Sequence, residues 1–192
     1  METSHLNTEQ IIIGLSWDPL VKPQLTDKIF TIFGQNKESF DLDLSCYIYG
    51  KDNSFLDYVS GMPGEMIDKS GSIRHSGDDR DGAGPDDDEQ IKIDFIGLPE
   101  DVQNIIIVVE VASAHAFKDI FTPSARIVDV QASTLFFNEN LKDEHNSDTS
   151  ACVLGRLERT SENGDWTLHP IKSFLNHEYV EDWSEFLTEF LS

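Results

Sequence analysis

The chain has 192 residues, of which 39% are hydrophobic and 10% aromatic, enough for one globular domain with a sizeable core. Its 14 basic and 36 acidic residues give a formal net charge of −22, which repels the phosphate backbone and excludes nucleic acid as an expected partner. No apolar run reaches the roughly 18 residues of a membrane span, and residues 1–10 lack the features of a signal peptide. We therefore expect a cytoplasmic protein with no direct membrane span.

The apolar clusters are mostly short and β-branched, and Gly, Asp, Asn and Pro separate them, a pattern typical of strands and turns. The sequence predicts an all-β fold, a two-sheet antiparallel β-sandwich with a C-terminal amphipathic helix. The expected strands are residues 11–17, 40–50, 55–59, 72–75, 91–95, 105–112, 125–131, 134–137, 151–159 and 166–171. Turn residues at 52–53 and 163–164 indicate two hairpins and hence antiparallel pairing.

Two strands carry specific predictions. In residues 40–50, Leu42 and Leu44 alternate with Asp41 and Asp43, which predicts one face in the core and one polar, chemically active face. Residues 105–109 are all Ile or Val without alternation, so we expect a central strand that is covered on both faces.

Three segments do not read as strands. Residues 19–39 and 142–150 are expected to be loops. In the tail, apolar residues fall on one helical stripe, which predicts a terminal amphipathic helix. This stripe could pack on the sandwich or be offered to a partner. We accordingly divide the chain into a sandwich domain, residues 1–177, and a helical tail, residues 178–192.

The most unusual segment is the acidic loop, residues 77–89, which holds seven carboxylates and one arginine. Such charges repel one another unless a multivalent cation gathers them, and calcium accepts six to eight oxygen ligands in flexible geometry. Gly82 and Gly84 would let the backbone turn carbonyl oxygens inward. Asp41 and Asp43, on one face of their strand, could complete the coordination shell. The alternative is a solvated acidic loop beside a polar strand face.

The spacing of the loop does not match an EF-hand, because with Asp79 at loop position 1 the twelfth position holds Gln90 rather than glutamate. Four segments together resemble the TerD family of tellurium-resistance stress proteins. Residues 14–18 resemble its GLGWD motif, residues 40–45 its FDLDAS motif, residues 77–89 its GDNxTGxGxGDDE loop, and residues 90–94 its QIKVDL strand.

This resemblance implies a β-sandwich that binds one or two calcium ions through the FDLD strand and the acidic loop. It carries a metal-binding role to Asp41, Asp43, Asp78, Asp87, Asp88 and Glu89. Asp79 stands where the family has Asn, and Asp81 where it has Thr. The full set of expected metal-binding residues is Asp41, Asp43, Asp78, Asp79, Asp81, Gly82, Gly84, Asp87, Asp88 and Glu89.

The resemblance also implies a non-enzymatic role in resistance to tellurite, phage and colicins, with Ca²⁺ as cofactor. Its implied partners are other tellurium-resistance proteins, including a TerC-type membrane protein. Two alternatives stay open: a metal-dependent hydrolase that uses the acidic loop, and a metal-independent protein that docks through its C-terminal helix. Against the hydrolase, no GxSxG, P-loop, HExxH or GxGxxG motif is present. We expect His75 to be a half-exposed structural residue, and Cys46 and Cys152 to be buried thiols without a disulfide.

Overall fold

A computed structural model describes residues 2–18, 40–80, 82, 86–112, 115–142, 148–161 and 164–192. The predicted loop at 19–39 lies outside the described residues, as do residues 143–147 of the loop predicted at 142–150.

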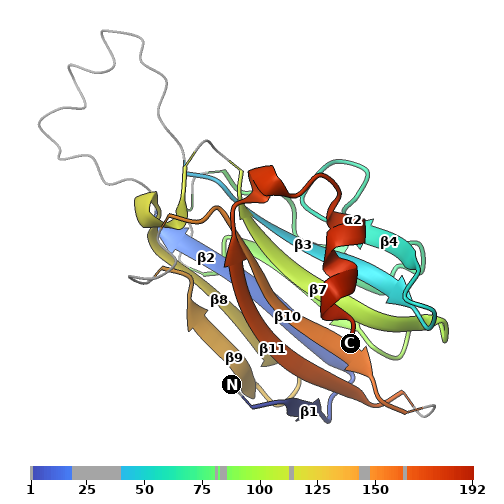
Figure 1. Cartoon of the computed structure of the whole chain (residues 1–192). Helices are drawn as coiled ribbons and strands as arrows, with labels where there is room; N and C mark the ends of the chain where they lie inside the picture. The colour runs from blue at the N-terminus through green and yellow to red at the C-terminus, as the bar shows by residue number, and fades with distance from the viewer. Residues whose placement is uncertain are drawn as a thin grey trace, which may run out of the picture.

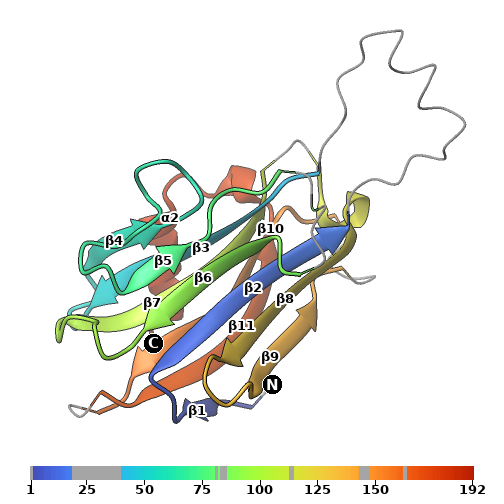
Figure 2. The same cartoon turned by 180° about the vertical axis from the view of Figure 1, so that it is seen from behind.

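Two antiparallel sheets pack face to face, which confirms the predicted fold class (Figures 1 and 2). The strands are β1 (Ser4–Leu6), β2 (Gln10–Asp18), β3 (Leu42–Gly50), β4 (Phe55–Val59), β5 (Ile73–His75), β6 (Glu89–Asp94), β7 (Val102–Val111), β8 (Phe121–Asp129), β9 (Leu135–Asn140), β10 (Ala151–Arg159) and β11 (Trp166–Leu175). One sheet has six strands in the order β1-β11-β10-β7-β3-β4, and the other has five in the order β5-β6-β2-β8-β9.

All ten predicted strands are present, although several begin earlier or end later than their apolar runs. β11, for example, continues to Leu175, and β8 begins at Phe121. The sequence did not predict β1, whose three residues pair with β11 and bury only Leu6. So short a segment contains no measurable period, and only its pairing partner makes it a strand.

The core lies between the sheets, where Ile and Leu side chains of β2 and β6 face those of β3, β7 and β10. β7 is an inner strand of the six-stranded sheet, and residues 105–109 are all completely buried, as predicted.

The hairpin predicted at 52–53 joins β3 to β4, and Asn53 adopts a positive φ of 62° there. Cys46 and Cys152 are buried free thiols, which confirms the expectation of no disulfide.

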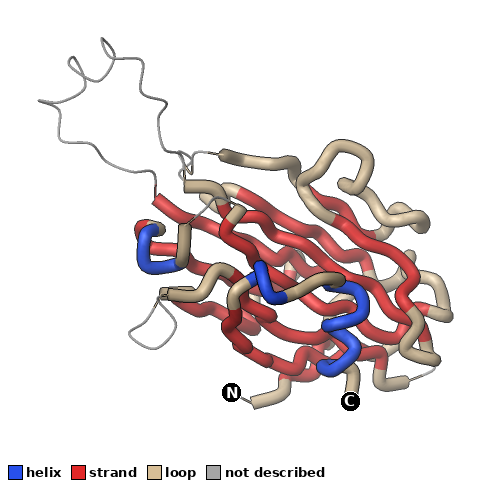
Figure 3. The backbone as a smooth tube through the Cα atoms, turned by 45° about the horizontal axis from the view of Figure 1, so that its top comes forward, coloured by secondary structure: helices blue, strands red, loops and turns tan. Residues whose placement is uncertain are grey.

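The prediction of one polar face on β3 is wrong for the second half of the strand. Tyr47 and Tyr49 point to the outer face of the six-stranded sheet, but both are buried. The C-terminal segment covers them and forms a second apolar cluster with Ile106, Val108 and Val153. Figures 1 and 3 show this segment lying across the outer face of the sheet.

The C-terminal segment is less helical than predicted. It contains two 3₁₀ turns, His177–Tyr179 (η2) and Leu187–Phe190 (η3), around one short α-helix, Trp183–Phe186 (α2). A further 3₁₀ turn, Phe117–Asp119 (η1), precedes β8. Of the two roles left open for the apolar stripe, the structure shows packing on the sandwich, since Leu187 is completely buried. None of the helices in the described part of the chain combines the length and apolar content that crossing a bilayer requires.

Candidate metal centre

Three of the predicted carboxylates meet at one end of the sandwich. Asp41 and Asp43 lie at the start of β3, and Asp78 lies in the loop that follows β5. One carboxylate oxygen from each lies within 4.8 Å of the others. Asp43 points to the outer face because its neighbours Leu42 and Leu44 point into the core. We call these three side chains the aspartate cluster.

Burial and repulsion between carboxylates raise the pKa values of two members of the aspartate cluster. Burial, followed by the charges of Asp78 and Glu89, raises the pKa of Asp41 to about 6. Burial, with Glu89 and Asp41, raises the pKa of Asp43 to about 7. Asp41 Oδ1 is buried and has no hydrogen-bond partner among the described residues. Asp78 accepts a hydrogen bond of 2.8 Å from the exposed Arg80 Nε, a contact that opposes the repulsion only in part.

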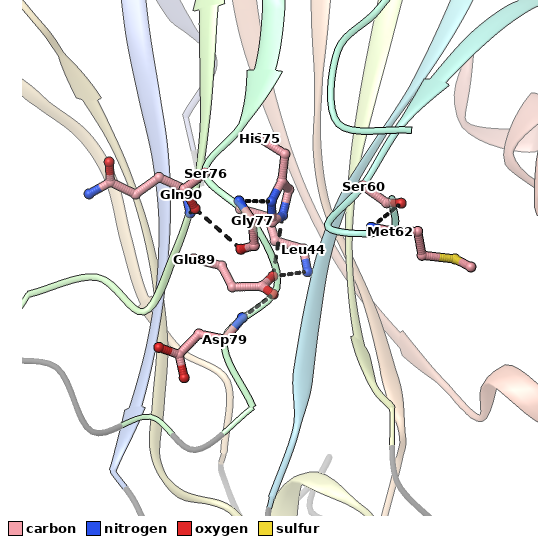
Figure 4. A network of polar contacts seen from close by, with 9 residues as sticks. All are labelled: Leu44, Ser60, Met62, His75, Ser76, Gly77, Asp79, Glu89 and Gln90. Carbon is pink, nitrogen blue, oxygen red and sulfur yellow. Dashed lines mark hydrogen bonds and ion pairs between the residues drawn. The ribbon is translucent and has the colours of Figure 1, made fainter. Parts of the chain in front are cut away.

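Glu89 joins the two chain segments that carry the cluster (Figure 4). Its side chain is completely buried. Its Oε2 accepts from the backbone N–H of Leu44 at 2.8 Å, and its Oε1 accepts from that of Asp79 at 3.3 Å. Leu44 lies beyond the last β3–β4 pair, which joins Cys46 to Val59, so no β4 residue faces its N–H. Glu89 therefore takes the place of a strand partner there and holds β3 beside the acidic loop.

His75 is buried, not half-exposed as expected from the sequence. Its Nδ1 accepts from the N–H of Gly77 at 3.0 Å, and its Nε2 lies 3.3 Å from Glu89 Oε2. The alternation of β5 contained the missed signal, because Ile73 is also buried while Arg74 between them is exposed.

Other predicted ligands shape the acidic loop. Asp79 Oδ1 accepts from the N–H of Gly82 at 3.0 Å, and Asp88 Oδ2 accepts from the N–H of Trp17 at 2.9 Å. Gly82 has a φ of +59°, and a Cβ there would lie 2.6 Å from Trp17 Nε1, so the close approach to β2 requires glycine. Asp81 and Gly84 lie outside the described residues.

Asp87 lies away from the aspartate cluster. Arg126 on β8 donates to both of its carboxylate oxygens, from Nε at 2.8 Å to Oδ1 and from Nη2 at 2.9 Å to Oδ2. Gln90 Nε2 adds a hydrogen bond of 3.1 Å, and only 6% of the Asp87 side chain is exposed. This bidentate pair ties the loop to the five-stranded sheet. Sequence alone gave no signal for it, because 39 positions separate the two residues.

Comparison with known proteins identifies the family of this chain. The family model described as the TerD domain matches residues 1–178. The tellurium resistance protein TerD of Serratia marcescens is 30% identical over 170 residues, which cover 85% of this chain and 79% of the relative. This chain belongs to the TerD family. General stress protein 16U of Bacillus subtilis is 28% identical over 171 residues, covering 85% of this chain and 80% of the relative.

Solved structures agree on the fold. The crystal structure of a TerD homologue from Streptomyces coelicolor A3(2) superposes with a TM-score of 0.71, covering 97% of this chain and 99% of that chain at 17% identity.

Within this TerD fold, the aspartate cluster offers only carboxylate oxygens. Hard cations such as Ca²⁺ prefer oxygen donors, whereas zinc and copper prefer nitrogen and sulfur donors. The buried, unpartnered Asp41 Oδ1 is also suited to a cation. The described donor set therefore fits a calcium ion.

Proposed function

We propose that this TerD-family chain is a calcium-binding, non-enzymatic stress-response module. The observation that carries the proposal is the aspartate cluster, three carboxylates with oxygens within 4.8 Å of one another although burial and repulsion disfavour the charges of Asp41 and Asp43. A divalent cation would offset that cost, with Asp41, Asp43 and Asp78 as its ligands. Glu89 would position them by holding Leu44 and Asp79.

The biological setting is proposed from the relatives. Proteins named for tellurium resistance and for general stress share the domain, so we place this chain in a stress response of the tellurite, phage and colicin resistance type. We further propose that it acts in the cytoplasm through protein contacts with other tellurium-resistance proteins, a TerC-type membrane protein among them. His75 does not support the hydrolase alternative, because both ring nitrogens face internal partners, Gly77 and Glu89.

Calorimetric titration of calcium into chelator-stripped protein, with magnesium as the comparison cation, tests the proposal. We expect one or two calcium ions to bind, and Asp43→Asn to lower the affinity about tenfold or more because it removes a charged ligand. Asp87→Asn is the matched control, since it makes the same chemical change at a carboxylate that Arg126 already pairs. We expect its calcium affinity to stay within about threefold of the wild type. The absence of binding heat at millimolar calcium would refute the proposal.

A further inference from the structure

Two basic side chains lie side by side on the outer face of the five-stranded sheet. Arg74 on β5 is directly opposite Lys92 on β6. The residues that flank them, Ile73, Ile91 and Ile93, belong to the core. Because successive side chains of a strand alternate between its two faces, Arg74 and Lys92 both point away from the core, and both are exposed. We call these two side chains the basic pair.

Within the described part of the chain, no carboxylate forms an ion pair with either member of the basic pair. Other described basic side chains do form one, namely Lys69, Arg80, Lys118, Arg126, Arg156 and Lys172. Like charges directly opposite each other on one sheet face destabilise the pairing of their strands. In a chain with 36 acidic residues, the stability of the fold therefore gives no reason for two adjacent cations without a counter-charge.

The basic pair borders a surface pocket of about 190 Å³, which is lined by Gln10, Gly71, Ser72, Arg74, Lys92 and Asp94. Among these lining residues Asp94 alone is acidic, and both of its oxygens accept hydrogen bonds. Oδ2 accepts from Gln10 Nε2 at 3.0 Å, and Oδ1 accepts from the N–H of Ile96 at 3.1 Å. Two positive charges thus face one negative charge whose oxygens already have partners.

A tight turn holds the guanidinium of Arg74 in place. Arg74 Nε donates to the carbonyl oxygen of Gly71 at 2.9 Å. Asp68 fixes this turn, since its Oδ2 accepts from the N–H of Ser70 at 2.9 Å and its Oδ1 from that of Ile73 at 2.7 Å. Among the described residues, the terminal nitrogens of Arg74 have no hydrogen-bond partner. The side chain is therefore ordered in advance of binding and keeps donors for a ligand.

We propose that the basic pair binds a phosphate group. A phosphate monoester carries a charge of about −1.5 to −2 at pH 7 and three strong acceptor oxygens, so it can neutralise both cations, whereas a carboxylate neutralises only one. Arg74 supplies the planar fork that matches phosphate oxygens, and Lys92 supplies a compact charge beside it. The site is separate from the aspartate cluster and its binding requires no calcium.

The position of the basic pair suits a group carried by another protein. In Figure 2 the five-stranded sheet faces the viewer, and none of the described helices crosses it. The net charge of −22 still disfavours a polyanion such as nucleic acid. A single phosphate is less affected, because physiological salt screens exposed charges beyond about 8 Å. The ligand is accordingly free phosphate or a phosphorylated side chain of a partner protein.

Chemical-shift titration of the ¹⁵N-labelled full chain tests the proposal. The protein is stripped of metal and then freed of chelator, because the carboxylates of a chelator would compete for the basic pair. Inorganic phosphate or a short phosphoserine peptide is added at constant ionic strength, balanced with sodium chloride. We expect saturable shifts at the amides of residues 71–74 and 92–94. A peptide that binds at least as tightly as inorganic phosphate identifies a phosphorylated side chain as the ligand, whereas binding of inorganic phosphate alone identifies free phosphate.

Substitutions show whether the two cations act together. Arg74→Gln and Lys92→Gln should each lower the phosphate affinity about fivefold or more, because each removes a charge-assisted contact. Arg74→Lys keeps the charge but loses the fork, so it should lower the affinity about threefold. Lys118→Gln is the matched control, since it removes the same charge from an exposed lysine that Asp148 already pairs. Its phosphate affinity should stay within about twofold of the wild type.

The proposal is overturned if chloride alone produces the same shifts, if neither phosphate compound gives a saturable response, or if Arg74→Gln and Lys92→Gln both bind like the wild type. The dispersion of the amide spectrum establishes that each variant is folded. Because the titration contains no calcium, its failure leaves the proposed function intact, and failure of the calcium titration leaves the phosphate site intact.

Discussion

Asp43 shows how a single residue can be unfavourable for folding and useful for binding. Its carboxyl is half-buried beside Asp41, Asp78 and Glu110, and these surroundings raise its pKa to about 7 from the ordinary value of 3.8. In the metal-free protein, folding therefore favours the neutral form of the Asp43 carboxyl. The contribution of this carboxyl to the free energy of unfolding is fully present below about pH 4 and is lost as the pH rises through 7.

Substitution of this carboxyl gives a pH test with a defined sign. Above pH 7, metal-free Asp43→Asn should be more stable than the wild type, because it removes a half-buried charge that burial and four acidic neighbours disfavour. The difference should disappear near pH 4, where Asp43 is neutral in the wild type. Urea unfolding of both proteins in chelator at pH 4, 6 and 8 measures it. A destabilising effect of equal size at all three values would show that Asp43 contributes packing rather than charge.

Cation affinity should fall as the pH falls, since protons compete for the same oxygens. With pKa values of about 7 for Asp43 and about 6 for Asp41, we expect affinity to be constant above pH 8. It should decrease by about two to three orders of magnitude by pH 5. Calorimetry in buffers of different ionisation enthalpy would also detect the protons released on binding. A flat affinity profile between pH 5 and pH 8 would place the ligands elsewhere.

Gly14 permits the close approach of Asp87 to β2. A Cβ at this position would lie 2.1 Å from Asp87 Oδ2, and Arg126 Nη2 donates to the same oxygen at 2.9 Å. We expect Gly14→Ala to destabilise the protein by about 1–3 kcal/mol because the side chain cannot move without breaking the ion pair. Chemical denaturation gives the value, and the double variant with Asp87→Ala should recover part of it. Equal losses with and without the Asp87 carboxylate would contradict this account.

At the scale of elements, the C-terminal segment is stabilised mainly by packing. α2 has only four residues, too few for stability on its own, although Asp182 caps it by accepting from Ser184 N at 2.8 Å and Glu185 N at 3.3 Å. Leu187, completely buried against the outer face of the sheet, should therefore be decisive.

Leu187→Ala should destabilise the protein by about 2–5 kcal/mol through the lost burial and the cavity left behind. Glu189→Ala, at an exposed position in the same 3₁₀ turn, should change stability by less than about 0.5 kcal/mol. Thermal unfolding of the two variants provides the comparison. If the two were equally stable, the segment would not be docked in solution.

For the whole molecule, calcium binding should appear as added stability. A ligand present at 100 times its dissociation constant stabilises the folded state by about 2.7 kcal/mol. In a protein of this size that corresponds to a rise in Tm of about 5–10 °C over the chelator-treated sample. Differential scanning calorimetry measures the shift, and Asp43→Asn should abolish most of it. Equal Tm values in calcium and in chelator would contradict the calcium proposal at this scale.

The sequence by itself determined the β-sandwich and ten of its eleven described strands, all but β1. Alternation in β3, the unbroken apolar run of β7 and the turn residues at 52–53 are local signals that depend on a period of two or on allowed backbone angles. It also indicated an acidic loop suited to a hard cation, because clustered carboxylates repel wherever the chain brings them together.

Only the tertiary structure decided which carboxylates meet. Asp41, Asp43 and Asp78 converge because Glu89 bridges β3 and the acidic loop, whereas Asp87, equally acidic in sequence, turns away to Arg126. It also decided that Tyr47 and Tyr49 are buried, because the segment that covers them lies more than 130 positions further along the chain. Local periodicity records which face a side chain takes. It does not record what the folded chain places opposite that face, since such contacts join residues distant in sequence.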